Sequence, residues 1–430
     1  MRFLPSAAAA ERAGLRACRR CRPETAPPPS AAAEHPAVTR RALRLIEAGY
    51  LDRNPVAGLA AELHVSERQL RRILADHLGA GPAELARTRR AGLARMLIDQ
   101  TDLPMARVAA EAGYRSIRRF NDEIRAGFGV TPTQLRRRRT APADAALVLR
   151  LAYRPPLDWA HLLAFLAARA IPGVETVTGG AYARTARLGG RPAIIELRPD
   201  PDHPRALLTI RGAGVGTVAE AAARARRLAD LDADPMAVEA VLAADPAVAA
   251  SVSAHPGLRV PGAWDPFELA VRAVLGQQVS VAAATTAAAR LAALLGEPLP
   301  DARGALTTLF PTPDAIADAP DAALAMPAGR RRAVRALAGA VAAGDLDLGP
   351  AADPEAAREG LLRIPGIGPW TADYIAMRGL RDPDAFPAGD LVIRRVLGGD
   401  AAAVRRRAAP WAPWRAYGAV HLWNTALEAR

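Results

Sequence analysis

Residues 361–379, LLRIPGIGPWTADYIAMRG, combine a tight turn with aromatic side chains. Gly366 and Gly368 permit a sharp hairpin and the close approach of another backbone. Pro369 suits the first turn of a helix, where its missing N–H costs nothing. Backbone amides at such a helix start point outward, and they can bind a phosphate. The pattern predicts helix, hairpin, helix with an anion-binding turn, although an ordinary helix connection can carry the same glycines.

Aromatic and acidic residues gather after this hairpin. Four of the six tryptophans lie in the last 61 residues, at positions 370, 411, 414 and 423. Asp390, in AFPAGDLVIRRVL, directly precedes an apolar helix, where an acid also serves as a cap. Aromatic faces attract a cationic group, and a carboxylate can stabilise a positive charge that develops beside it.

The composition narrows the chemistry further. The 430 residues contain no lysine, and Cys18 and Cys21 are the only cysteines. A disulfide framework is therefore excluded, and a reducing cytoplasm fits. No apolar run is long enough to span a membrane, and MRFLPSAAAAERAG lacks the apolar core of a secretory signal. We expect a cytoplasmic protein, associated with the bacterial nucleoid and not with a membrane.

Positive charge is concentrated in the first third of the chain. Residues 1–140 hold 26 Arg against 14 acidic residues, whereas the other 290 hold 31 Arg against 30. A GC-rich genome would enrich arginine everywhere, but it would not concentrate the charge in this way. The asymmetry indicates that this part meets a polyanion, most simply nucleic acid.

The chain divides into four segments, at Pro/Ala-rich junctions near residues 23–36 and 136–145 and at a change of pattern after residue 255. We predict a multidomain, mostly α-helical protein. VLRLAYR, PAIIELRP and ALLTIRG alternate or bunch apolar residues as strands do, with a helical stretch between the first two, so a small α+β domain is expected at 146–255. Residues 256–430 read as almost entirely helical. The remaining segments are a short N-terminal piece, 1–30, and a helical region at 36–140.

The helical region contains one unit twice. In each unit a short helix and a turn precede a second helix, capped by Ser66 in the first and by Ser116 in the second, with Gly113 in the second turn. The second helices carry exposed arginines, namely Arg68, Arg71 and Arg72, then Arg115, Arg118 and Arg119. Two such units closed by GFGVTPTQLR resemble the AraC-type double helix-turn-helix domain. The resemblance implies that these arginines contact DNA, although a solvated basic face would look similar.

Read with its flanks, LLRIPGIGPWTA resembles the hairpin of the helix-hairpin-helix DNA glycosylase superfamily. Together with DPFELAVRAVLGQQVSVAAA and PWRAYGAVHLW, it is similar to the 3-methyladenine DNA glycosylase II family over residues 146–430. The resemblance implies that Asp390 is catalytic and that Trp370, Tyr374 and Trp423 line the base pocket. It makes Gln278 the residue inserted into DNA, where relatives often carry a larger apolar side chain. Trp411 and Trp414 are expected to be core residues.

The same resemblance implies a monovalent cation at the hairpin, held by the backbone carbonyls of Leu362, Ile364 and Ile367. No other cofactor is expected. Related enzymes that also cut the backbone use a lysine amine, which this chain lacks, so we expect a monofunctional enzyme. The expected substrate is double-stranded DNA with alkylated purines such as 3-methyladenine and 7-methylguanine, and a monomer is expected.

The segment around Cys18 and Cys21 resembles the end of the zinc domain of Ada-type alkylation-response regulators. That family uses four cysteines, and two thiolates cannot close a structural zinc site. We therefore expect a truncated remnant without zinc, or a true start upstream of Met1. The alternative function is a transcription regulator of the alkylation response that keeps an inactive glycosylase-like fold. The broken zinc motif argues against methyl-triggered regulation, as does the absence of a PCHR methyltransferase signature.

Overall fold

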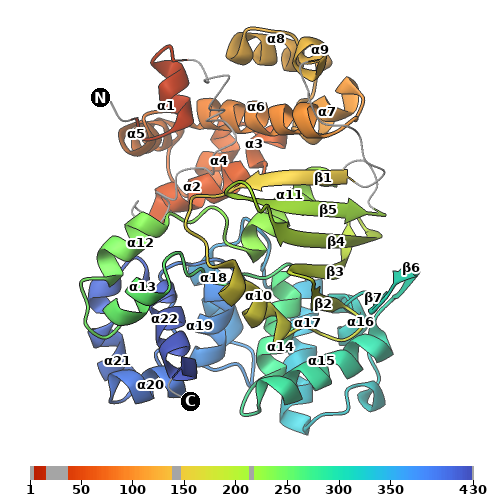
Figure 1. The fold of residues 1–430 in the computed structure, drawn as a ribbon, viewed down its shortest axis with the longest axis vertical. Coiled ribbons are helices and arrows are strands. Elements are labelled where there is room, and N and C mark those ends of the chain that lie inside the picture. Colours follow the sequence, from red (N-terminus) through yellow and green to blue (C-terminus); the bar gives the residue numbers. More distant parts are fainter. Residues whose placement is uncertain (1–3, 16–36, 138–146, 213–216, 429–430) are drawn as a thin grey trace.

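The computed structural model describes residues 4–15, 37–137, 147–212 and 217–428. It confirms the multidomain, mostly helical architecture, with a small sheet domain between two helical parts (Figure 1). The N-terminal part is entirely helical in its described residues, with α1 (Ala7–Arg12), α2 (Ala37–Glu47), α3 (Tyr50–Arg53), α4 (Val56–Glu62), α5 (Glu67–Leu78), α6 (Pro82–Gln100), α7 (Met105–Glu111), α8 (Ile117–Phe128) and α9 (Pro132–Arg137).

Two helix-turn-helix units, α4–α5 and α7–α8, flank the long helix α6. The side chain of Ser66 accepts a hydrogen bond from Gln69 N, and that of Ser116 accepts one from Arg119 N. Gly113 adopts a φ of 89° in the second turn. Both predicted caps and the predicted glycine turn are therefore confirmed.

The sheet domain has five antiparallel strands in the order β1-β5-β4-β3-β2. Its elements are β1 (Leu147–Ala152), α10 (Trp159–Ala167), β2 (Glu175–Thr178), β3 (Ala181–Leu188), β4 (Arg191–Pro199), β5 (Arg205–Arg211), α11 (Val218–Leu228), α12 (Pro235–Leu242) and α13 (Ala249–Ala254). The sequence predicts three of these strands and misses β2 and β3. β3 reads AYARTARL, and its alanines hide the strand because alanine is depleted in strands.

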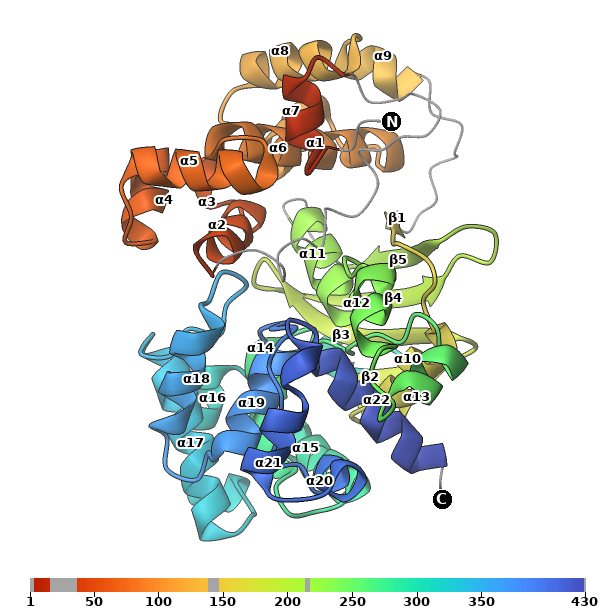
Figure 2. The same cartoon turned by 90° about the vertical axis from the view of Figure 1, so that its left-hand side faces the viewer.

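Helix α6 covers the outer edge of this sheet. The side chain of Gln100, the last residue of α6, accepts from Arg150 N at 2.6 Å and donates to Arg150 O at 3.4 Å. An edge strand otherwise presents unpaired backbone groups. Leu97 and Ile98 of α6 share a buried cluster with Leu149 of β1, so the helix-turn-helix part and the sheet are packed together (Figure 2).

The C-terminal part contains the helices that carry the predicted site. They are α14 (Pro266–Leu275), α15 (Val281–Leu295), α16 (Pro313–Ala317), α17 (Ala328–Ala342), α18 (Pro354–Leu362), α19 (Pro369–Arg378), α20 (Leu391–Leu397), α21 (Ala401–Arg407) and α22 (Arg415–Glu428). A short hairpin of β6 (Pro298–Arg303) and β7 (Leu306–Thr308) was not predicted from the periodicity.

Two buried clusters hold these helices. One joins α14, α15 and α17–α19, and the other joins α20–α22 to α12 and α13. Trp411 and Trp414 are buried in the second cluster, as predicted for core residues. No described helix is both long and apolar enough to cross a membrane.

Candidate active site and DNA-binding surfaces

Asp390 lies at the start of α20 and receives four N–H groups. Its Oδ1 accepts from Val392 N at 2.9 Å and from Ile393 N at 3.1 Å, so it caps the helix. Trp370 Nε1 donates to Oδ2 at 2.9 Å, and Trp423 Nε1 donates to Oδ1 at 3.1 Å. Hydrogen bonds to a carboxylate are among the stronger ones in proteins. The cap and the candidate catalytic group are thus one residue, held in a fixed position.

The three aromatic residues predicted for the base pocket lie around Asp390. The rings of Trp370 and Tyr374 are stacked, with centroids 5.3 Å apart and an interplanar angle of 13°. Trp423 lies 6.2 Å from Tyr374 at an angle of 53°. All three side chains are partly exposed, which leaves their rings available to a ligand. The structure therefore brings together the four residues named from α19, α20 and α22.

The hairpin connects α18 to α19. Gly366 adopts a φ of 93°, and a Cβ atom there would lie 3.0 Å from Ala333 Cβ, so glycine is required. Gly368 is the residue before α19, and Pro369 begins that helix. Gly366 and Gly368 are exposed at this turn, and the phosphate-binding role predicted for it stays a prediction.

The loop between α14 and α15 carries Gln278 and is tied to the hairpin by its neighbour. Gln277 Nε2 donates to Gly366 O at 2.9 Å and to Thr371 Oγ1 at 3.0 Å, and Arg330 donates to Gln277 O at 2.6 Å. Gln278 itself is exposed and has a φ of 58°. A positive φ is uncommon for a residue other than glycine, and the DNA-inserting role predicted for Gln278 stays a prediction.

Three residues that sequence reasoning missed lie next to Tyr374. Arg378 Nη1 donates to Tyr374 Oη at 2.6 Å, and its guanidinium stands over Phe165 at 4.7 Å. Arg169 lies over the same ring at 3.7 Å, and its charge helps to lower the pKa of Tyr374. Phe165 and Arg169 belong to the sheet domain, and nothing in the stretch WAHLLAFLAARA signals a functional role.

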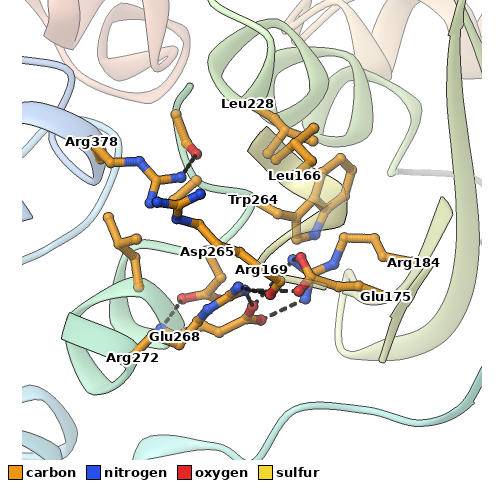
Figure 3. A pocket seen from close by; sticks show the side chains of 13 residues that line it. Leu166, Arg169, Glu175, Arg184, Leu228, Trp264, Asp265, Glu268, Arg272 and Arg378 are labelled. Atoms are coloured by element: carbon orange, nitrogen blue, oxygen red, sulfur yellow. Dashed lines mark hydrogen bonds and ion pairs between the residues drawn. The ribbon is translucent and has the colours of Figure 1, made fainter. Parts of the chain in front are cut away.

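Behind these residues a small cavity of about 20 Å³ lies between the sheet domain and α14 (Figure 3). Its walls include a buried charge cluster. Arg184 contacts Glu268 at 2.5 Å, and Arg272 contacts Glu175 at 2.8 Å and Glu268 at 3.0 Å. Burial raises the pKa of Glu175, but Arg272 and Arg184 outweigh it and hold that pKa below its usual range. Charge pairing thus joins the two domains behind the aromatic pocket.

The arginines predicted for DNA binding lie on α5 and α8 or just before α8, and all six are exposed. Arg71 pairs with Glu67, and Arg119 pairs with Glu123 at 2.8 Å. Arg115 donates to the carbonyls of Asp52 and Arg53, so its guanidinium also holds the end of α3. Among the described contacts, Arg68, Arg72 and Arg118 have no ion-pair partner. Those three are the better candidates for phosphate contacts.

Two further predictions concern metal ions. Cys18 and Cys21 lie outside the described residues, so the structure does not bear on them. At the hairpin, the carbonyl of Ile364 accepts from Ile367 N at 3.1 Å, and Leu362 is exposed at the end of α18. A carbonyl oxygen has two lone pairs, so the hydrogen bond at Ile364 leaves room for a second contact, and the cation site stays a prediction.

Family models match four consecutive stretches of the chain. They describe the metal binding domain of Ada at 1–24, a helix-turn-helix domain at 59–138, the AlkA N-terminal domain at 148–265 and an HhH-GPD superfamily base excision DNA repair protein at 271–405. The solved 3-methyladenine DNA glycosylase of Archaeoglobus fulgidus has the same fold over 65% of this chain and 98% of its own, with a TM-score of 0.56 at 20% identity. The hairpin, the aromatic pocket and these matches define a DNA glycosylase of the HhH-GPD superfamily fused to a helix-turn-helix domain.

Two relatives narrow this class. A Mycobacterium tuberculosis protein named a probable bifunctional transcriptional activator/DNA repair enzyme AlkA is 47% identical over 436 residues, covering 99% of this chain and 88% of its own. The DNA-3-methyladenine glycosylase 2 of Escherichia coli is 41% identical over 279 residues, covering 64% of this chain and 96% of its own. The chain belongs to the AlkA family, with a helix-turn-helix domain before its AlkA N-terminal and HhH-GPD domains, and is a homologue of DNA-3-methyladenine glycosylase II.

Proposed function

We propose that this protein is a monofunctional glycosylase that excises alkylated purines, such as 3-methyladenine and 7-methylguanine, from double-stranded DNA. The observation that carries the proposal is the convergence of Trp370, Tyr374 and Trp423 around the carboxylate of Asp390. The hairpin would hold the DNA backbone while the damaged nucleotide leaves the stack. Gln278 would fill the gap, and the exposed Val279 and Val281 beside it supply apolar surface.

The geometry suits a substrate that already has a good leaving group. Alkylation at N3 or N7 gives the purine a positive charge and weakens its glycosidic bond. Electron-rich rings attract such a cation, and each cation–π contact stabilises the bound base by about 0.5–2 kcal/mol. Asp390 would stabilise the positive charge that develops on the sugar at C1′ and orient a water molecule for attack. Because the chain lacks lysine, no lysine amine forms a Schiff base with the sugar, and the abasic strand stays intact.

The decisive experiment incubates the purified protein with methylated duplex DNA and measures released bases and abasic sites. Asp390→Asn should abolish release, with a loss of at least about 100-fold, because an electrostatic stabiliser of the transition state is removed. Asp400→Asn is a matched control, since Asp400 also caps a helix but contacts neither tryptophan among its described partners. Strands should stay intact until alkali is added.

The competing function is transcriptional regulation by an inactive glycosylase-like fold. Two observations support this alternative, namely the helix-turn-helix domain and the name of the mycobacterial relative. Tight, sequence-dependent DNA binding without base release would establish that function instead.

We also propose that the protein acts as a monomer. It would need no zinc, and it would hold at most a monovalent cation at the hairpin. Dialysis against chelator should leave glycosylase activity unchanged.

A further inference from the structure

The hydroxyl group of Tyr374 meets two guanidinium groups. Arg378 donates to Oη at 2.6 Å, and the guanidinium of Arg169, which is held over Phe165, acts on the same hydroxyl through its charge. Arg378 is itself fixed, because its other nitrogens donate to the carbonyls of Pro261 at 2.6 Å and Gly262 at 3.1 Å. A guanidinium has no acceptor. The oxygen of Tyr374 is therefore the acceptor in its hydrogen bond with Arg378.

Within the described residues, this arrangement leaves the O–H of Tyr374 free to donate. A phenol has one O–H to donate, and the N–H of Arg378 uses an acceptor position of its oxygen. No acceptor for this O–H is among the contacts of the described residues. Burial raises the pKa of Tyr374, but Arg378 and Arg169 outweigh it and hold that pKa below its usual range. A more acidic hydroxyl is a stronger hydrogen-bond donor.

The direction of a bound purine follows from the position of Asp390. The sugar C1′ must lie near that carboxylate, and the purine is attached to C1′ through N9. The edge that carries the C6 substituent is then the part farthest from Asp390. Trp370 donates to Asp390, and Tyr374 lies one helical turn farther along α19. The C6 edge is then expected on the side of the pocket where Tyr374 lies.

We propose, on the basis of the glycosylase function proposed above, that Tyr374 donates a hydrogen bond to the C6 edge of the extracted purine. Arg169 and Arg378 act as positioning residues that turn the hydroxyl toward the base. A carbonyl at C6, as in 7-methylguanine, accepts this bond, whereas the amino group of 3-methyladenine does not. The pocket thus adds a hydrogen-bond preference to the attraction of aromatic rings for a cation.

The proposal gives the sheet domain a part in substrate choice. Arg169 follows α10, and its guanidinium is held over Phe165 at 3.7 Å. Its backbone carbonyl accepts from Arg272, a member of the buried charge cluster. Burial lowers the pKa of Arg169, with Tyr374 acting in the opposite direction. The inner end of the pocket is thus assembled from two domains and held by buried charges.

The test uses the full chain and duplex DNA treated with a methylating agent, so that both lesions are present in the same reaction. The release rates of 7-methylguanine and 3-methyladenine are measured under single-turnover conditions. Tyr374→Phe should lower the ratio of the first rate to the second by roughly 3- to 10-fold, the size of one hydrogen bond. Arg169→Met should lower the ratio in the same direction, and Arg169→Lys should restore much of it.

Tyr417→Phe is the matched control, because Tyr417 is a buried tyrosine that donates to Asp230 in another cluster. For Tyr417→Phe, the ratio of 7-methylguanine release to 3-methyladenine release should equal that of the unaltered protein. An equal fall in both rates for Tyr374→Phe would show that Tyr374 only supports the pocket, and it would overturn the proposal. Release of neither lesion by the unaltered protein is a different result. It would refute the glycosylase function itself, and this inference with it.

Discussion

Asp390 organises the aromatic pocket as well as the start of α20. Its two oxygens accept from two indole N–H groups and two backbone N–H groups. Each indole ring is therefore oriented by the carboxylate. An asparagine at this position would turn an NH₂ group toward donors that need an acceptor. The orientation of Trp370 and Trp423 should be followed by near-ultraviolet circular dichroism when Asp390→Asn is assayed.

Gly366 offers a second test at the scale of single residues. Gly366→Ala should destabilise the protein by about 1–2 kcal/mol, because alanine is strained at a φ of 93°. Its methyl group would also press on Ala333. Urea unfolding followed by tryptophan fluorescence measures the loss, since all six tryptophans lie beyond residue 146.

Gly339→Ala is the control for this prediction. Gly339 lies within α17, and a Cβ there would meet no atom within 4 Å. Alanine at this position should stabilise the protein by up to about 1 kcal/mol, because it favours the helix more than glycine does. Equal effects of the two substitutions would contradict the requirement for glycine at the hairpin.

At the scale of elements, α22 serves two purposes. Trp423 lies beside Asp390, and His421, on the same helix, is buried against α13. Ser251 Oγ lies 3.0 Å from His421 Nδ1, and His161 and His255 also face this histidine. Burial, followed by His255 and His161, lowers the pKa of His421 to about 4. The helix that supplies part of the pocket therefore depends on a neutral histidine.

This histidine should make the protein sensitive to acid. Because its pKa is lower in the folded protein than in the unfolded chain, the unfolded chain binds the extra proton between about pH 6.5 and 4. Stability is then lost as the pH falls through that range, by about 2 kcal/mol at pH 5. The His421→Asn protein keeps an acceptor for Ser251, and its free energy of unfolding should fall correspondingly less between pH 7.5 and 5. An identical pH dependence of urea unfolding in both proteins would contradict this assignment.

At the scale of the whole molecule, the helix-turn-helix part is packed on the glycosylase. Gln100 of α6 caps the edge strand β1, and Arg41 of α2 pairs with Asp353 before α18 at 3.5 Å. Deletion of residues 1–140 would expose that edge and the buried leucines beneath α6. Surface substitutions are therefore the cleaner way to test whether this part binds DNA.

Replacing Arg68, Arg72 and Arg118 with Gln should reduce the slope of log affinity against log salt by about 2–3, if each contacts one phosphate. Binding to undamaged duplex DNA, measured by fluorescence anisotropy at several salt concentrations, gives the slope. A control protein with Gln at the exposed Arg191, Arg198 and Arg211 of the sheet matches the change in charge. Equal changes in both proteins would attribute the effect to net charge alone.

The sequence alone determined the features that depend on a few adjacent residues. Ser66, Gly366 and Asp390 could be assigned to a cap, a hairpin turn and a helix start because backbone conformation there is set by local preferences. The resemblance of LLRIPGIGPWTA extended this to a family, which the comparisons confirmed. The roles assigned to the site residues remain predictions.

Only the tertiary structure decided how distant segments meet. It placed Phe165 and Arg169 beside Arg378, about two hundred residues away along the chain, and it paired Glu175 with Arg272. No periodicity marks such contacts, because they depend on how the sheet domain packs on α14 and α19. The strand β3 was hidden for a related reason, since its stability comes from pairing with β4 and not from its own residues. Local preference fixes the elements, whereas long-range packing completes the pocket.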